Sequence, residues 1–108
     1  MICHSDAVAF EDLGQGVKRR VLSYATELMM VEVIFEEGAL GALHSHPHSQ
    51  ISYVQEGELE VYLGESIVVL KKGDTFYVEP HLVHGVKALA PSTLVDVFTP
   101  QREDFLKS

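Results

Sequence analysis

The sequence predicts an all-β domain, either a closed barrel or a sandwich of two sheets. Its apolar residues recur at every second position in several short runs, which is the period of a half-buried strand. Turn signals separate these runs at intervals of roughly ten residues, as in all-β domains built from short strands. The chain has 108 residues, of which 46% are hydrophobic, so it can form one domain around one core.

The predicted strands follow one another along most of the chain. Alternation and turn residues together predict strands at residues 17–24, 28–35, 51–54, 58–63, 67–70, 75–78, 83–89 and 93–98. The clearest alternation is at 58–63, where Leu59, Val61 and Leu63 would face inward before a hairpin turn at 64–66. A helical turn is predicted only at residues 101–107. We therefore expect a single domain over residues 1–108, with a barrel from about 16 to 99 and a C-terminal tail at 100–108.

The charge and the cysteine content restrict the partners and the compartment. Eight basic residues and sixteen acidic residues give a formal net charge of −8, whereas nucleic acids and anionic membrane surfaces require a basic face. An anionic small molecule would need a local cation in this protein. With Cys3 as the single cysteine, no intramolecular disulfide can form, and the N-terminus does not resemble a signal peptide. We expect a cytoplasmic protein that binds neither nucleic acid nor membranes.

Half of the histidines lie in the segment His44-Ser45-His46-Pro47-His48-Ser49-Gln50. Because alternate side chains of a strand share a face, His44 and His46 would point the same way and could bind one ion. Gln50 and the distant His84 are further neutral donors that a barrel could bring beside this pair, which suggests a metal site. The alternative is a polar surface loop with solvated histidines.

Three other histidines are not expected to be ligands. His48 shares the parity of His44 and His46, but Pro47 interrupts a regular strand, so we expect His48 at the rim of the site. His81 and His4 are interpreted as solvated residues of a loop and of the N-terminus.

Two motifs around these donors resemble the signatures of the cupin superfamily. The first is Gly38-x5-His44-Ser45-His46-x3-Gln50-x6-Gly57, and the second runs from Gly73-Asp74 through Pro80 to His84. The sequence departs from the family pattern where Gln50 replaces the usual acid, and at Glu79, His81 and Ala88. The resemblance implies a double-stranded β-helix barrel with one divalent metal, namely zinc, nickel, manganese or iron. The implied ligands are His44, His46, Gln50 and His84.

The neutral side chain of Gln50 affects the expected charge of this site. A carboxylate ligand would reduce the charge of a divalent ion, whereas an amide leaves it in full. The site would then be a stronger Lewis acid and would attract an anion, in spite of the negative charge of the chain.

The strand near the C-terminus holds a second group of polar and aromatic residues. Asp96 and Phe98 share a face of the predicted strand 93–98, and an inward aspartate is costly unless it is paired or used. On alternation alone, a hydrogen-bonded structural Asp96, a core Phe98 and a surface Arg102 are an equal alternative.

A wider resemblance favours a catalytic role for these three residues. The segments VKRRVL (17–22), LMMVEV (28–33), GALHSHPH (41–48), LVDVFTP (94–100) and REDF (102–105) are similar to the pectin-degradation cupins of the KdgF family. The resemblance implies linearisation of 4,5-unsaturated monouronates, the sugars that lyases release from pectin or alginate. It places the active-site positions of the family at Asp96, Phe98 and Arg102.

The implied reaction is the opening of a cyclic hemiacetal to its ketone form, an isomerisation. The metal would bind the carboxylate and the ring oxygen of the sugar, and Asp96 would act as a general base and then as a general acid. Arg102 would hold the carboxylate and Phe98 would contact the ring. Two alternatives remain: a metal-dependent cupin oxygenase, and a non-catalytic module that binds acid sugars. Strand edges at the N-terminal end and the resemblance to cupins also lead us to expect a homodimer.

Overall fold

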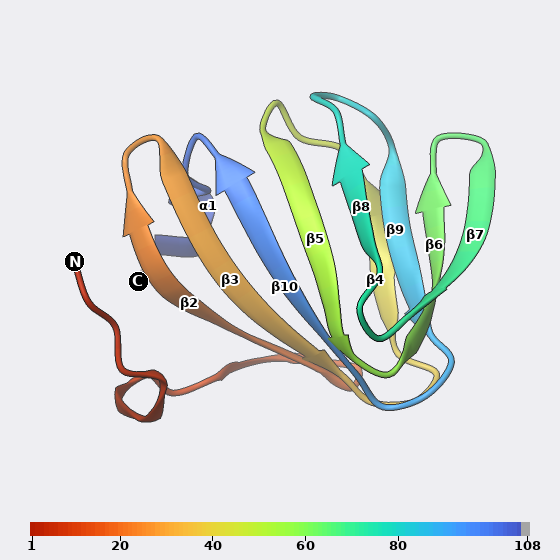
Figure 1. Ribbon diagram of the computed structural model, residues 1–108, viewed down its shortest axis with the longest axis horizontal. Coiled ribbons are helices and arrows are strands. Elements are labelled where there is room, and N and C mark those ends of the chain that lie inside the picture. Colours follow the sequence, from red (N-terminus) through yellow and green to blue (C-terminus); the bar gives the residue numbers. More distant parts are fainter. Residues whose placement is uncertain (107–108) are drawn as a thin grey trace.

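The structure is a computed structural model, and it describes residues 1–106. This part of the chain is built almost entirely from strands (Figure 1). In chain order the elements are η1 (Ser5–Ala7), β1 (Glu11–Gly14), β2 (Val17–Ala25), β3 (Leu28–Phe35), β4 (Leu40–His44), β5 (Ser49–Glu56), β6 (Glu58–Leu63), β7 (Ser66–Lys71), β8 (Thr75–Val78), β9 (His84–Ala88), β10 (Ser92–Thr99) and α1 (Glu103–Leu106).

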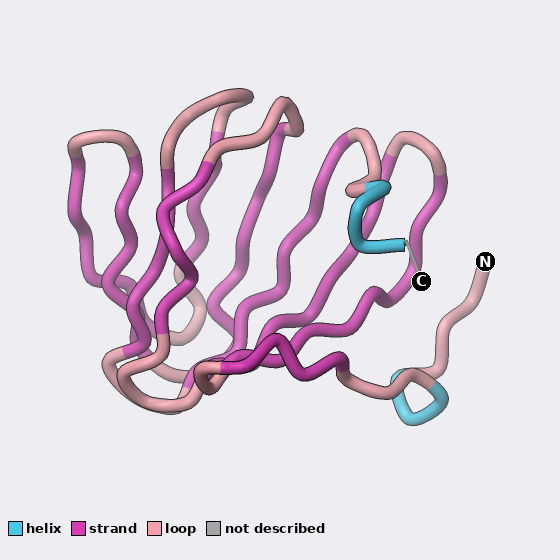
Figure 2. The backbone as a smooth tube through the Cα atoms, turned by 180° about the vertical axis from the view of Figure 1, so that it is seen from behind, coloured by secondary structure: helices cyan, strands magenta, loops and turns pink. Residues whose placement is uncertain are grey.

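The strands form two sheets in which every pairing is antiparallel, so the prediction of a single all-β domain is confirmed. The six-stranded sheet has the order β1-β2-β3-β10-β5-β8, and the four-stranded sheet has the order β4-β9-β6-β7. Figure 2 shows α1 lying across the strands at one side of the molecule. Neither helix within residues 1–106 is long and apolar enough to cross a membrane.

Eight of the ten strands correspond to predicted ones, and the predicted hairpin at 58–70 is confirmed as β6 and β7. The predicted strands did not include β1 or β4, although the interpretation of His44 and His46 assumed a strand at these two residues. All residues of β1 are exposed, so this strand lacks the alternation by which strands were recognised, and β1 also begins before residue 16. The helical turn expected at 101–107 is α1, which ends at Leu106, and residues 107–108 lie outside the described residues.

The core lies between the two sheets and follows the alternation of the sequence. Every second residue of β3 and of β10 is buried, including Met29, Val31, Leu94 and Phe98. On the opposite sheet, β6 contributes the fully buried Leu59 and Val61, as predicted, while Leu63 is partly buried against them. Burying side chains of this size stabilises the fold by roughly 1.5–3 kcal/mol each.

Strand register brings together residues that are distant in sequence. On β5 and β10, Gln50 pairs with Phe98 and Ser52 pairs with Asp96. On β4 and β9, His44 pairs with His84 after an irregularity that follows Gly41. Gly85 is required at this point, because a Cβ atom there would lie 2.7 Å from the Gly41 carbonyl oxygen. The two strands can therefore approach closely beside both histidines.

Candidate metal centre and cavity

A cavity of about 210 Å³ opens between the two sheets. Six of the seven residues predicted for the site line it: His44, Gln50, His84, Asp96, Phe98 and Arg102. The seventh, His46, lies beside it, with its ring centroid 4.7 Å from that of His84. The structure thus brings together residues from two separate parts of the sequence, 44–50 and 84–102, at one place.

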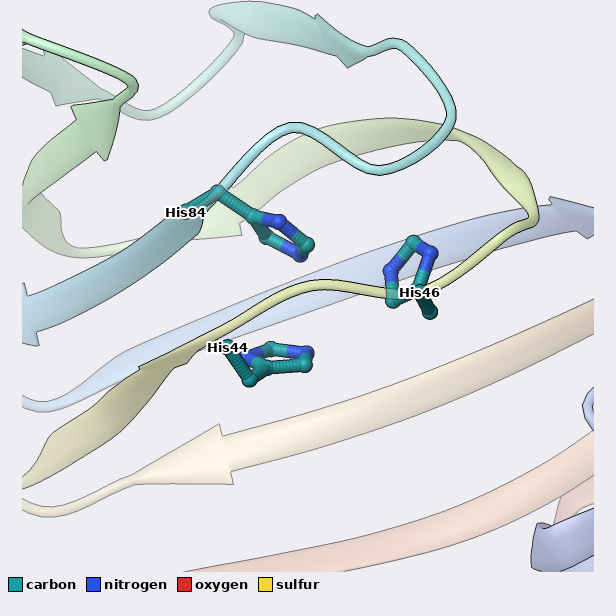
Figure 3. A group of neighbouring side chains, drawn as sticks. All are labelled: His44, His46 and His84. Atoms are coloured by element: carbon teal, nitrogen blue, oxygen red, sulfur yellow. The ribbon is translucent and has the colours of Figure 1, made fainter.

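Three histidines form a group that could hold a metal ion. The ligand nitrogen atoms of His44, His46 and His84 all lie within 4.8 Å of one another. Figure 3 shows the three rings turned toward a common centre, from the end of β4, from the loop that follows it and from the start of β9. His44 is exposed, whereas His46 and His84 are buried. Three imidazoles with one open side are a donor set that suits several divalent transition metals.

The backbone fixes the orientation of all three rings. Each Nδ1 atom lies near a main-chain carbonyl two residues away: 2.8 Å for His44 and Ala42, 3.1 Å for His46 and His48, and 2.8 Å for His84 and Leu82. A ring that donates its Nδ1 proton to a carbonyl keeps the Nε2 lone pair free for a metal. These contacts therefore select the tautomer in which Nε2 is the ligand.

The protonation states of the buried rings also fit a metal site. Burial lowers the pKa of His84 to about 4, and it lowers the pKa of His46 below 6.5. Both rings are consequently neutral at pH 7, the form that binds metals. The Nε2 atom of His84 is buried and has no hydrogen-bond partner, which a bound cation would satisfy.

Gln50 adds a fourth donor that faces the same point. Its Oε1 atom lies 2.9 Å from Nε2 of His46. If His46 donates its Nδ1 proton to the His48 carbonyl, both of these atoms are acceptors, and two facing lone pairs repel each other. A cation held by both atoms would remove this conflict. The donor set of the site therefore fits the metal that the cupin resemblance implied.

Asp96 is buried on the inner face of β10 and lines the cavity. Burial raises its pKa to about 6, although the Ser52 hydrogen bond and the positive charge of Arg102 act in the opposite direction. Ser52 Oγ donates to Asp96 Oδ1 over 2.5 Å. A carboxylate with a pKa near 6 in a cavity can both accept and return a proton at neutral pH.

Arg102 lies at the same cavity and contacts two aromatic rings. Its guanidinium carbon is 5.1 Å from the Phe98 ring centroid and 4.2 Å from the Phe105 ring centroid. Its Nε and Nη2 atoms donate to the carboxylate of Asp104 over 3.2 Å and 3.0 Å. Asp104 is 57% exposed, so it can leave or share this cation at little cost.

One part of the reasoning from sequence was wrong. It assumed that His44 and His46 alternate on a single strand, but β4 ends at His44 and His46 lies in the loop before β5. The loop, rather than strand alternation, brings the two rings together. His48 is outside the group of three histidines, and its Nε2 atom instead lies 3.2 Å from the Gln101 carbonyl oxygen.

The sequence analysis did not identify two further polar residues on the inner face of the six-stranded sheet. Ser52 is fully buried and connects Gln50 with Asp96. Arg19 on β2 lines the cavity, and its guanidinium carbon lies 3.7 Å from the Phe105 ring centroid. The sequence gives only one indication of both residues, namely their place in the alternation of their strands. Each occupies an inward-facing position, where an apolar residue is expected.

Comparison with known proteins places the chain in a family. The profile of the cupin domain family matches residues 31–98. The pectin degradation protein KdgF of Dickeya dadantii (strain 3937) is 42% identical over 103 residues, which cover 94% of each chain. The structure of KdgF from a Halomonas species superimposes with a TM-score of 0.92 at 36% identity and covers 96% of both chains. An RmlC-like cupin of Shewanella frigidimarina gives a TM-score of 0.93 at 44% identity and covers 96% of this chain and 94% of that one. The chain therefore belongs to the cupin family and, within it, to the KdgF group of pectin-degradation proteins.

Proposed function

We propose that this protein opens the ring of 4,5-unsaturated monouronates derived from pectin or alginate. The proposal rests on Asp96, a carboxylate whose pKa is raised. It shares one small cavity with the guanidinium group of Arg102 and with the candidate metal centre. The cavity volume of about 210 Å³ is below the ~300–1,000 Å³ typical of pockets for drug-sized ligands, which favours a single sugar ring. The relation to the pectin degradation protein KdgF supports this class of substrate.

Asp96 would move the proton in this reaction. Its Oδ1 atom accepts the hydrogen bond of Ser52, so Oδ2 is the oxygen that we assign to the substrate. This oxygen would take the proton of the C1 hydroxyl group while the bond between C1 and the ring oxygen breaks. The electron pair moves to the ring oxygen to form an enolate, and return of the proton to C4 gives the open 5-keto-4-deoxyuronate. Proton transfer by a positioned side chain contributes about 10²–10⁴ to a rate.

Arg102 and Phe98 would hold the substrate in the cavity. The Nε side of the guanidinium is engaged by Asp104, so we assign the sugar carboxylate to the edge formed by Nη1 and Nη2. Phe98 lies on the same face of β10 as Asp96 and presents an apolar surface to the ring. These two contacts would orient the C1 hydroxyl group toward the base.

His44, His46, Gln50 and His84 are the residues that we propose as metal ligands. A bound divalent ion would supply positive charge beside the sugar carboxylate and the enolate oxygen. All four side chains are neutral ligands, so the ligands themselves contribute no negative charge that would repel an acid sugar. This local property would let a chain with a formal net charge of −8 bind an anion.

The ultraviolet absorbance of the conjugated enoate provides the test, because ring opening removes this absorbance. Protein loaded with a divalent metal should accelerate the loss of absorbance, and Asp96→Asn should reduce the rate by at least about 10² while it retains the metal. If the loaded protein binds the sugar but returns it unchanged, the site is a binding module. Oxygen consumption during the assay would instead indicate an oxygenase.

A further inference from the structure

A chain of close polar contacts, two of which are hydrogen bonds, connects the candidate metal centre with the proposed base. Gln50 Oε1 lies 2.9 Å from His46 Nε2, Gln50 Nε2 lies 2.8 Å from Ser52 Oγ, and Ser52 Oγ lies 2.5 Å from Asp96 Oδ1. All four residues are buried, and Ser52 is 0% exposed. Gln50 and Ser52 alternate on β5, so both side chains point to the inner face, and Ser52 is the register partner of Asp96 on β10. The sheet register therefore fixes the path of the chain.

The chemistry of the groups fixes the direction of both hydrogen bonds, the one from Gln50 to Ser52 and the one from Ser52 to Asp96. An ionised carboxylate only accepts, and a serine hydroxyl has one hydrogen to give. Ser52 must therefore donate to Asp96 and use its oxygen to accept from Gln50. Only the NH2 group of the Gln50 amide can donate to Ser52, which leaves Oε1 on the side of His46. The orientation of the amide thus follows from Asp96 at the other end of the chain.

We propose that Ser52 is a positioning residue that makes Gln50 present its oxygen, rather than its NH2 group, to the metal. The inference rests on the proposed function, since it takes Asp96 as ionised and Gln50 as a ligand. If the Gln50 amide were rotated by 180°, its NH2 group would face the cation and could not bind it. Ser52 is fully buried and does not line the cavity, so it would act entirely through its partners Gln50 and Asp96.

The same arrangement explains why a glutamine stands where a carboxylate is usual in cupins. A glutamate at position 50 would carry no hydrogen for Ser52, and the single hydrogen of Ser52 is already given to Asp96. Two buried carboxylates would then compete for one donor, which is costly in a site of low dielectric. Glutamine at position 50, serine at position 52 and aspartate at position 96 therefore form a matched set.

A double-mutant cycle on metal affinity tests this role without any measurement of activity. Protein stripped with a chelator is titrated with Zn²⁺ against a chromophoric competitor, for Ser52→Ala in the wild-type and in the Gln50→Glu background. Loss of a hydrogen bond that orients a ligand typically costs 10–100-fold in metal affinity, so we expect at least a tenfold loss in the wild-type background. We expect less than a threefold loss in the Gln50→Glu background, because both oxygens of a carboxylate can face the metal.

The control is Ser23→Ala, which removes an exposed hydroxyl group of β2 and should leave the affinity unchanged. If Ser52→Ala does not fold, Ser52→Cys replaces it, since a thiol has a similar volume but is a weak donor and acceptor. An equal loss in both backgrounds, a larger loss with Gln50→Glu, or no loss in the wild type overturns the proposal. Failure of the enoate assay leaves this measurement unaffected, so the two proposals can fail separately.

Discussion

Replacement of Asp96 by asparagine should make the metal-free protein more stable at neutral pH, even though it should slow ring opening by at least about 10²-fold. Asp96 is buried, with 8% of its surface exposed, and burial raises its pKa from 3.8 to about 6. One pKa unit corresponds to about 1.4 kcal/mol, so the charge of Asp96 costs the fold about 3 kcal/mol at pH 7. Asparagine has nearly the same shape and avoids this cost.

The effect must depend on pH in one direction. The pKa of Asp96 is higher in the folded than in the unfolded protein, so its favourable contribution is complete below pH 3.8 and is lost as the pH rises through about 6. The gain from Asp96→Asn should therefore be largest above pH 7 and should shrink between pH 6 and pH 4. The substitution should also carry a cost in the free energy of unfolding that is the same at every pH. This cost arises because the new NH2 group needs its own hydrogen-bond partner.

The assay is urea denaturation of chelator-treated protein, followed by circular dichroism at several pH values. Asp6→Asn serves as the control, since it removes the same charge from an exposed residue and should show no such pH dependence. A difference in unfolding free energy between Asp96→Asn and wild type that stays constant from pH 4 to pH 8 would refute the reasoning. The same raised pKa predicts that kcat/KM for ring opening falls as the pH decreases below about 6.

Three further predictions concern binding, packing and assembly. Arg19→Met should raise KM for the unsaturated uronate about fivefold in the enoate assay, because Arg19 is a second cation at the cavity. The control Lys18→Met changes an exposed residue and should leave KM unchanged. Leu59→Ala should lower the free energy of unfolding by about 2–5 kcal/mol, because Leu59 is fully buried, and Ile67→Ala at a 63% exposed position should cost far less by urea denaturation. The edge strand β1 should support a homodimer, for which light scattering would give twice the 12.0 kDa mass of the chain, and a monomer would contradict the prediction.

Several of the strands that the sequence predicted have one buried face, although β7, which was predicted as half of a hairpin, is mostly exposed. β3 and β10 alternate between buried and more exposed residues, so their apolar pattern is visible without any knowledge of their neighbours. β4 is different, because it is short, and its residues are mostly exposed. Its existence depends on pairing with β9, which a pattern within one segment cannot reveal.

In the candidate site, too, some residues could be recognised from the sequence pattern, whereas others could be recognised only from strand pairing. Histidine spacing and the family resemblance identified His44, His46 and His84, and the structure brings their ligand atoms together. Ser52 has no such signal, because a serine at an inward position of β5 does not differ from any other small residue. The proposed role of Ser52 depends on the register between β5 and β10, which places Ser52 opposite Asp96. Arg19 was missed because an arginine in a strand is normally expected to face the solvent.

The proposed metal ligands belong to different sheets, so metal binding would be coupled to the stability of the fold. His44 and His84 lie on the four-stranded sheet, whereas Gln50 lies on the six-stranded sheet. A metal held by all three would cross-link the two layers at the mouth of the cavity. At a free metal concentration of 100 times Kd, binding would add about 2.7 kcal/mol to the stability of the fold. The supply of metal would then affect the fraction of molecules that are folded as well as the rate of ring opening.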